Sequence, residues 1–193
     1  MEHEGKRKRR SREDLLKAGL NILARHGEGA LTIESLCKRL NVTKGSFYHH
    51  FGSKDDFRRH LLDYWAREHT WRFIEFCDRE DSAEERYRNL DAVSQETDDD
   101  VEVAVRTWAQ RDPQAREYQE RIDRMRIEYL EKLYSEMLGG SERASVFALL
   151  EYAAFVGSRQ IMPGLDKARI RELLGLWTEM LKPYLKEGRD ETA

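Results

Sequence analysis

Residues 32–51 read TIESLCKRLNVTKGSFYHHF, and this stretch decides the fold of the N-terminal part of the chain. Thr32 is suited to cap a short helix whose apolar residues recur every three or four positions. A two-residue connection, Asn41-Val42, separates it from a second short helix that follows Thr43. Two short helices joined by such a tight turn form a helix-turn-helix, whose second helix fits the major groove of B-DNA. The stretch therefore predicts a DNA-binding motif.

Helices are also predicted on both sides of this motif. Ser11, with Asp14 three residues later, has the pattern of a capping box and opens a first helix. Ser53, with Asp56 three residues later, opens a fourth helix that should reach roughly Asp78. The predicted buried side of this fourth helix carries five large apolar residues: Phe57, Leu61, Trp65, Phe73 and Phe76.

The remaining chain continues as long amphipathic helices, without the alternation of a strand. Ser141 is expected to cap one of them, and Pro163-Gly164 is expected to break the chain before the last. The prediction is an all-α fold of about nine helices in two domains. Residues 1–60 form a three-helix DNA-binding domain with a basic N-terminal arm, and residues 61–193 form a helical ligand-binding and dimerisation domain. The later helices are expected near residues 83–95, 99–110, 113–138, 141–162 and 167–186.

Charge is distributed unevenly along the 193 residues, although the net charge is only −3. Residues 1–60 hold 14 Lys and Arg against 8 Asp and Glu, whereas the rest of the chain holds 20 against 29. The first part is therefore basic, at +6, and the remainder is acidic, at −9. A polyanion such as DNA would meet the basic part, and the acidic remainder would limit non-specific binding.

Several other classes of protein fit the sequence poorly. The apolar stretches are too short for a bilayer, and the first residues lack the apolar core of a secretory signal, so a cytoplasmic location without membrane contact is expected. Cys37 and Cys77 form no metal-ligand pair and are expected to be reduced, buried thiols. No nucleophile elbow, phosphate-binding loop or zinc motif is present, and the histidines show no ligand spacing. Neither catalysis nor a cofactor or bound metal is expected.

Residue types along the second helix suit contact with DNA. The hydroxyl of Thr43 and the helix N-terminus suit a phosphate, and Lys44 can reach a guanine edge or a phosphate. Gly45 has no side chain to hold the backbone away, and Lys54 at the start of the next helix suits another phosphate. Hydrogen-bonding side chains occupy further positions: Ser46, Tyr48, His49 and His50.

The motif is similar to the signature of TetR-family regulators of the AcrR-like kind. The matching string is Leu31-Thr32, Val42-Thr43-x-Gly45-x-x-Tyr48-x-His50-Phe51-x-Ser53-Lys54, followed by Phe57 and Leu61, and it covers about the first 60 residues. Departures are mild: Leu36-Cys37 replaces the usual Ile-Ala, and Asn41 replaces a glycine, whose αL conformation asparagine also tolerates.

The resemblance implies roles for individual positions. Thr43, Tyr48, His50 and Lys54 would contact phosphates, and Lys44, Gly45 and Ser46 would lie nearest the base edges. Thr32 and Glu34 correspond to positions that often touch DNA. Because an acid there would repel phosphate, Glu34 is expected either to accept from a cytosine amino group or to point away, and pointing away is favoured.

The resemblance also implies a dimer and a ligand pocket in the second domain. The last two helices would form a four-helix interface between subunits, with Ala148, Ala153, Ala154, Gly157, Leu173, Trp177 and Met180 as candidates. A small-molecule pocket would lie among the other helices, with eight aromatic candidates: Trp65, Phe73, Phe76, Trp108, Tyr118, Tyr129, Phe147 and Tyr152. For any one of these residues, an ordinary core position is the competing interpretation.

The sequence thus predicts a homodimer that binds a palindromic operator in double-stranded DNA. Its recognition helices would enter major-groove turns about 34–36 Å apart, and a small effector would release it, as in a repressor. The alternatives are an architectural or protein-interaction factor without a ligand and, more weakly, a helical enzyme. A pocket too small for a metabolite would favour the architectural factor.

Overall fold

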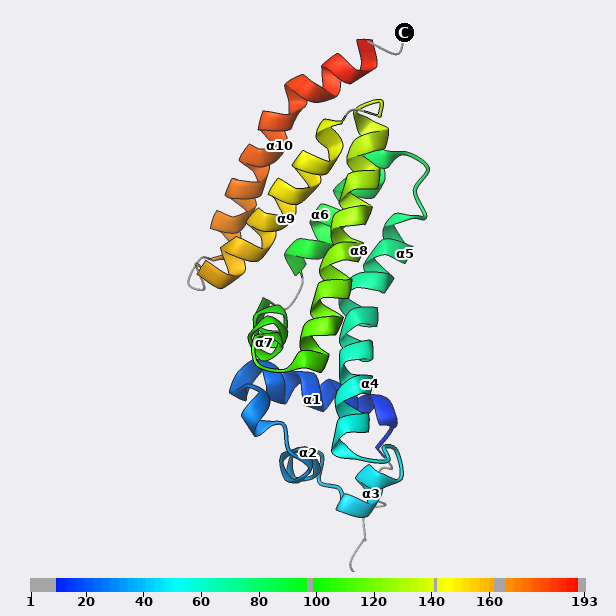
Figure 1. The fold of residues 1–193 in the computed structure, drawn as a ribbon, viewed down its shortest axis with the longest axis vertical. Helices are drawn as coiled ribbons and strands as arrows, with labels where there is room; N and C mark the ends of the chain where they lie inside the picture. Colours follow the sequence, from blue (N-terminus) through cyan, green and yellow to red (C-terminus); the bar gives the residue numbers. More distant parts are fainter. Residues whose placement is uncertain (1–9, 97–98, 141, 162–165, 191–193) are drawn as a thin grey trace, which may run out of the picture. The chain divides into compact units, whose positions relative to one another are not determined.

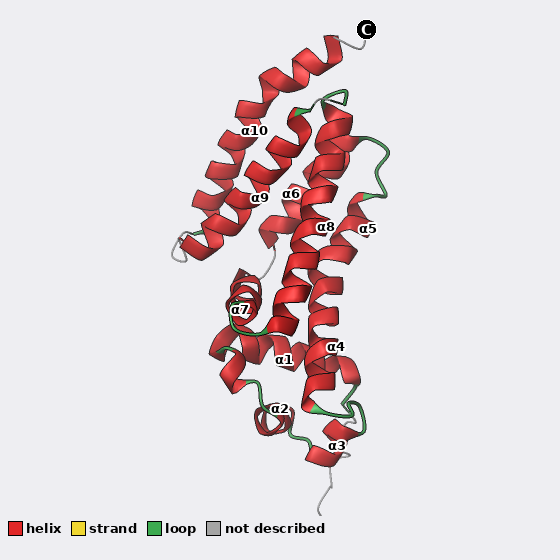
Figure 2. Cartoon of the chain, viewed as in Figure 1, coloured by secondary structure: helices red, strands yellow, loops and turns green. Residues whose placement is uncertain are grey.

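The computed structural model describes residues 10–96, 99–140, 142–161 and 166–190, and these ranges are helical apart from turns (Figure 2). No strand occurs within them. Helix α4 (Lys54–Ala66) continues through a π-helical segment, η2 (Arg67–Trp71), into α5 (Arg72–Cys77). Counted in this way, the described ranges contain nine helical stretches besides one short 3-10 turn. The predicted all-α fold is confirmed.

The chain forms two compact units. The first comprises Met1–Trp65 and Asp100–Arg116, so it takes in residues beyond the predicted boundary at residue 60. Within it, α1 packs against α2, and α2 packs against α3. Its elements are α1 (Arg12–His26), η1 (Glu28–Ala30), α2 (Ile33–Leu40), α3 (Lys44–Tyr48), nearly all of α4, and most of α7 (Asp99–Ala109).

Two predicted helix caps in the first unit are confirmed. The Ser11 hydroxyl accepts a hydrogen bond from the Asp14 amide at 3.0 Å, and the Asp14 carboxylate accepts one from the Ser11 amide at 2.9 Å. Before α4, the Ser53 hydroxyl accepts from the Asp56 amide at 3.0 Å, and the Asp56 carboxylate accepts from the Gly52 amide at 3.0 Å. Each cap supplies partners for amides that a helix start leaves unpaired, and a cap is worth about 1 kcal/mol.

The turn between α2 and α3 depends on Asn41. Its φ of 52° and ψ of 51° place it in the αL region, where no other described non-glycine residue has a positive φ. The following amide, that of Val42, donates back to the Cys37 carbonyl at 3.0 Å. Asparagine therefore serves where the family usually has glycine, as the sequence predicts.

Three phenylalanines hold α3 against α4. Phe47, Phe51 and Phe57 are each at most 1% exposed, and their ring centroids lie 5.0–5.5 Å apart. Burying such a side chain contributes about 1.5–3 kcal/mol, so this cluster fixes a helix of only five residues. The predicted inward orientation of Phe47 and Phe51 is confirmed.

The second unit comprises Ala66–Asp99 and Glu117–Ala193. In Figure 1, α9 and α10 run side by side and antiparallel along α8, and ring contacts from Phe147 to Tyr134 and to Trp177 join the three helices. The predicted cap Ser141 and the predicted break at Pro163-Gly164 lie outside the described residues. The unit contains η2, α5, α6 (Ala83–Glu96), most of α8 (Pro113–Met137), α9 (Arg143–Ile161) and α10 (Lys167–Asp190).

The π-helical segment changes which face of the fourth predicted helix is buried. A π turn inserts one extra residue into the α-helical register, so positions beyond it rotate by roughly 100°. Thr70 and Cys77 are consequently buried, at 2% and 0% exposure, whereas Phe76 is 42% exposed. The prediction that Phe76 lies on the buried side is wrong, because it assumed an unbroken α-helical period.

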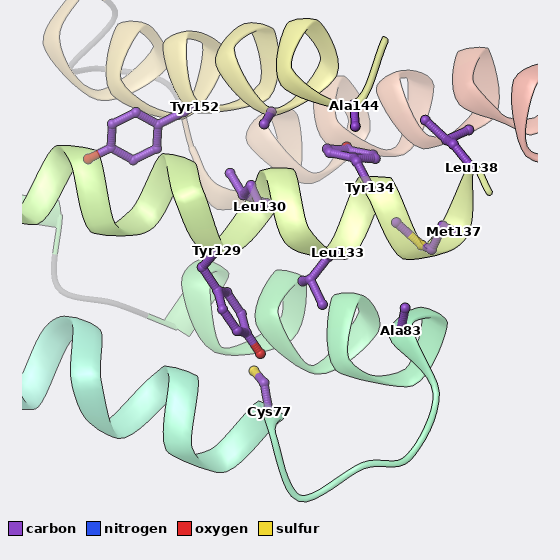
Figure 3. Packing of buried hydrophobic residues seen from close by; sticks show 11 residues of the cluster. Cys77, Ala83, Tyr129, Leu130, Leu133, Tyr134, Met137, Leu138, Ala144 and Tyr152 are labelled. Carbon is purple, nitrogen blue, oxygen red and sulfur yellow. The ribbon is translucent and has the colours of Figure 1, made fainter. Parts of the chain in front are cut away.

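The core of the second unit lies where α8 meets α5, α6 and α9 (Figure 3). Tyr129 reaches from α8 to the end of α5, where its hydroxyl donates to the Asp78 carboxylate at 2.9 Å. Cys77 lies beside it, and burial raises the pKa of its thiol to about 11. Both Cys37 and Cys77 are free and buried, as predicted.

Candidate DNA-binding surface and ligand cavity

The exposed side of α3 and its flanks is polar. Tyr48 is 54% exposed, with its ring edge against Phe47 at 5.4 Å, so its hydroxyl is held away from the core. Lys44, His49 and Lys54 are also exposed. These residues stand on a rigid support, because Phe47 beneath them is fully buried. A rigid polar surface of this kind suits a duplex.

The two threonines predicted to contact DNA differ in how their hydroxyls are used. The Thr43 hydroxyl accepts from the Ser46 amide at 3.2 Å, which leaves its own O–H to donate outward. The Thr32 hydroxyl accepts from the Ser35 amide at 3.1 Å and donates to the Ser35 hydroxyl at 3.2 Å. Thr43 therefore remains able to donate to a phosphate, whereas Thr32 is engaged within its own capping box.

Glu34 forms an ion pair with Lys44 across the helix-turn-helix. The hydrogen bond from Lys44 lowers the pKa of Glu34, and the same bond raises the pKa of Lys44. Both side chains are largely exposed, so the pair adds little stability. The pair matters for DNA binding. Lys44 is predicted to approach base edges, and in the free protein Glu34 holds its ammonium group.

Gly45 is open to the outside of the chain. A Cβ added there would meet only the Thr43 hydroxyl, at an ordinary 3.7 Å, so nothing within the chain demands glycine. Close approach of an external backbone is the remaining reason for the missing side chain. On the next turn, the His50 ring nitrogen lies 3.1 Å from the Arg10 carbonyl oxygen and ties the end of the N-terminal arm to the motif.

A cavity that is partly open to solvent lies in the second unit, and its volume is about 80 Å³. Typical ligand pockets are larger, at about 300–1,000 Å³. Its polar members are His69, Thr70, Asp91, Ser94, Arg126 and Glu151, and its apolar and aromatic members are Phe73, Ile74, Leu90, Tyr129, Leu130, Tyr152 and Phe155.

The π-helical segment and α8 shape one wall of this cavity through Arg126. Its Nε donates to the Thr70 hydroxyl at 2.9 Å, and a terminal nitrogen donates to the His69 carbonyl at 3.2 Å. The Tyr152 hydroxyl lies 3.4 Å from the guanidinium and donates to Asp123 at 2.6 Å. The widened turn thus brings a carbonyl and a hydroxyl to a half-buried cation, as π-bulges at functional sites often do.

Comparison with known proteins points to one family. The family described as "Bacterial regulatory proteins, tetR family" matches residues 15–61, the helix-turn-helix and its supporting helices. The transcriptional regulator AcuR of Cereibacter sphaeroides is 37% identical over 59 residues, which cover 28% of this chain and 27% of that protein. The helix-turn-helix region of the chain is therefore similar in sequence to the TetR family.

Solved structures with the TetR fold extend the likeness along the chain. A transcriptional regulator from Rhodococcus sp. Rha1 has a TM-score of 0.69 and 22% identity, covering 90% of this chain and 97% of that one. A regulator from Saccharomonospora viridis, determined in complex with choline, has a TM-score of 0.64 and 18% identity, covering 87% and 95%. At these identities the likeness shows the fold. The sequence matches to curated TetR relatives span only 27% and 23% of those proteins.

The structure brings together some of the predicted pocket residues. Phe73, Tyr129 and Tyr152 line the cavity. Trp65 and Trp108 are buried in the first unit, and the Trp108 ring lies 4.9 Å from the Arg58 guanidinium. The other three candidates are also absent from the cavity lining: Phe76, which is exposed, Tyr118, whose ring lies under Arg121, and Phe147, which contacts Tyr134 and Trp177.

The predicted dimer residues divide between core and surface. Ala148 is fully buried in the core of its own unit, and Trp177 packs at the edge of that core. Ala153, Ala154, Leu173 and Met180 are exposed, and Gly157 is half-buried. They adjoin other exposed apolar side chains on the same two helices: Val146, Leu149, Leu150, Ile161, Leu176 and Tyr184.

Three charged cavity residues escaped the sequence prediction: Asp91, Arg126 and Glu151. Glu151 could have been noticed in the sequence, because it is the single charged residue in the largely apolar run from Ala144 to Val156. Asp91 and Arg126 lie among many other charged residues of α6 and α8, so the sequence does not distinguish them.

Among the described residues, no helix combines the length and apolar character that crossing a bilayer requires. No group of three or more histidine, cysteine or acidic side chains is placed to hold a metal ion in the same ranges.

Proposed function

We propose that the chain is a homodimeric transcriptional repressor that binds a palindromic operator and leaves it when a small molecule occupies the cavity. The observation that carries DNA binding is the helix-turn-helix of the TetR family, whose exposed face presents Thr43, Tyr48 and Lys54 over a fixed aromatic core. Backbone contacts of this kind position a protein on the duplex, and Lys44 with Ser46 would read bases once Lys44 leaves Glu34.

Two features of the second unit support the rest of the proposal. The cavity combines charged and aromatic side chains, a lining that suits a small molecule, and a ligand-responsive regulator requires its volume of about 80 Å³ to widen on binding. The exposed apolar side chains of α9 and α10 form the kind of surface that marks a protein interface. Dimerisation through them would supply the two DNA-reading heads that a palindrome needs.

The test is selection of genomic fragments by the purified chain, followed by footprinting. The expected result is protection of a short palindrome, with Tyr48→Ala and Lys54→Ala each weakening binding. Lys54→Ala should also lower the salt dependence by about one phosphate contact, whereas the uncharged Tyr48 should leave it unchanged. Lys132→Ala is the matched control, because Lys132 is exposed on α8 in the second unit. Binding without sequence preference would count against a specific regulator, and equal binding by all variants would count against the assigned surface.

A further inference from the structure

Two carboxylates stand on the cavity wall without a cationic partner. Asp91 of α6 and Glu151 of α9 both line the cavity, and neither forms an ion pair with any described residue. Asp91 accepts a hydrogen bond from the Gln95 amide at 2.9 Å. Burial raises the pKa of Glu151, and the negative charge of Asp91 adds a smaller effect in the same direction, so the two acids are close enough to interact. Two acids on one wall attract a positive charge.

All of the hydrogen bonds to Glu151 come from neutral donors and reach one oxygen. The hydroxyls of Tyr87, at 3.0 Å, and Tyr134 donate to Oε2, as does the Trp177 indole at 3.2 Å. Oε1 accepts no hydrogen bond from the described residues. The carboxylate is therefore held firmly by one oxygen while the other remains available to a ligand in the cavity.

Among the described residues, Arg126 contributes the one guanidinium that lines the cavity, and it is already engaged. It donates to the Thr70 hydroxyl and the His69 carbonyl, and the Tyr152 hydroxyl lies beside it. An anionic ligand would have to displace these partners and would also face two carboxylates. The charges of the wall therefore favour a cation over an anion.

Aromatic rings complete the chemistry of the wall. Tyr152 and Phe155 stack with their centroids 5.9 Å apart and their planes 14° apart, and Phe73 and Tyr129 line the same cavity. Ring faces attract cations, most effectively where water is excluded. Rings beside carboxylates suit an organic cation with an apolar body better than a metal ion.

We propose that the effector is an organic cation, an amine or quaternary ammonium compound with an apolar body, whose charge lies against Asp91 and Glu151. This proposal rests on the ligand response proposed above. Glu151 also hydrogen-bonds Tyr87 of α6, Tyr134 of α8 and Trp177 of α10. A charge drawn to Glu151 consequently acts on three helices at once, including one that carries the exposed apolar surface.

The test is calorimetric titration of the full chain with three probes of similar size. They are benzyltrimethylammonium, its uncharged carbon isostere neopentylbenzene, and the anion phenylacetate. The cation is expected to bind at least about tenfold more tightly than either of the others, since a desolvated charge pair exceeds the 1.4 kcal/mol that a factor of ten requires. Tighter binding of phenylacetate or equal binding of the isostere overturns the proposal.

Two variants test whether the positive charge of the ligand lies against Glu151 and Asp91. Glu151→Gln keeps an acceptor for the three donors, and Asp91→Asn is an independent second variant; each should weaken cation binding about tenfold and leave the isostere unchanged. Glu128→Gln, on the exposed side of α8, is the matched control and should bind as the unmodified chain does. Unchanged cation binding in both variants overturns the proposal.

The outcomes also separate this proposal from the proposed function. If phenylacetate or neopentylbenzene released the footprinted DNA and the cation did not, the proposal of a cationic effector would be overturned. A regulator released by a ligand would still be supported. If the chain protected its operator but bound none of the probes, the proposal of a cationic effector would be overturned. The same result would count against release by a ligand and would leave the proposed DNA binding intact.

Discussion

At the residue scale, the pair formed by Glu34 and Lys44 sets how strongly the helix-turn-helix attracts DNA. Glu34→Gln should tighten operator binding roughly three- to tenfold and raise the salt dependence by about one phosphate contact. The physical reason is that Lys44 is freed and a negative charge is removed from the surface that meets the duplex. Fluorescence anisotropy with the footprinted operator at several salt concentrations measures both quantities.

Glu13→Gln is the control for this prediction. Glu13 forms an exposed ion pair with Lys17 at 2.8 Å on α1, so the variant removes the same charge from a similar pair outside the helix-turn-helix. A gain in affinity equal to that of Glu34→Gln would show that overall charge, and not the freed Lys44, is responsible. No gain in either variant would mean that Lys44 already reaches DNA while paired.

A second residue-scale prediction concerns the pH dependence of stability. Burial raises the pKa of Glu151 above its ordinary 4.5, against the opposing effect of its hydrogen bonds from Tyr134, Tyr87 and Trp177. Between the two pKa values, the folded protein holds a proton that the unfolded chain releases, so stability from this site falls as pH rises through that window. Urea unfolding at a series of pH values from 4.5 upward should show this fall in the unmodified chain.

Glu151→Gln should lack this contribution, because the amide does not titrate. The free energy of unfolding of Glu151→Gln, relative to that of the unmodified chain, should therefore increase as the pH rises. Glu128→Gln should follow the unmodified chain at every pH. Parallel pH profiles for all three proteins would show that Glu151 titrates at its ordinary pKa in the folded state.

At the element scale, the crossing of α1 and α4 depends on a glycine. A Cβ at Gly19 would lie 2.8 Å from Cζ of Phe57 and 3.0 Å from Cδ1 of Leu61. Gly19→Ala should therefore destabilise the protein by about 1–3 kcal/mol through overpacking, measured by urea unfolding. Gly29→Ala is the control, since nothing lies within 4 Å of a Cβ there, and it should change stability by less than about 0.5 kcal/mol. Equal effects of the two variants would contradict the close-packing argument.

The same scale explains what the sequence could predict. Caps such as Ser11 with Asp14, and the αL turn at Asn41, depend on neighbouring residues alone, so a local pattern indicates them correctly. The π turn after α4 has no comparable local pattern. Its conformation depends on distant contacts, such as the hydrogen bonds from Arg126 to Thr70 and to the His69 carbonyl. Those contacts connect residues more than fifty positions apart.

The two candidate sites also differ in whether they depend on neighbouring residues or on distant ones. The motif that meets DNA is one continuous segment, so its residues are visible in sequence. The cavity gathers side chains from η2, α5, α6, α8 and α9, and aromatic content alone identified only Phe73, Tyr129 and Tyr152 among them. Phe147 is aromatic as well, but it lies on a face of α9 that contacts Tyr134 of α8 and Trp177 of α10.

At the scale of the whole molecule, operator binding should depend on the apolar surface of α9 and α10. Leu149 and Leu150 are 57% and 50% exposed on α9, and Met180 is 66% exposed on α10. Leu149→Glu places a charge in this surface and should convert the dimer to a monomer, as measured by sedimentation. Operator affinity should fall by about a hundredfold or more, because the second half-site loses the advantage of being bound within the same complex.

Phe76→Glu is the matched control for the dimer. It also places an acid at an exposed large apolar side chain, 42% exposed, but on α5. This variant should remain dimeric and bind the operator as the unmodified chain does, since the charge stays outside the proposed interface. A dimer that survives Leu149→Glu, or one that dissociates equally with Phe76→Glu, would remove α9 and α10 as the interface. A monomer that still binds the palindrome at full affinity would instead separate DNA binding from dimerisation, because each head would then suffice without its partner.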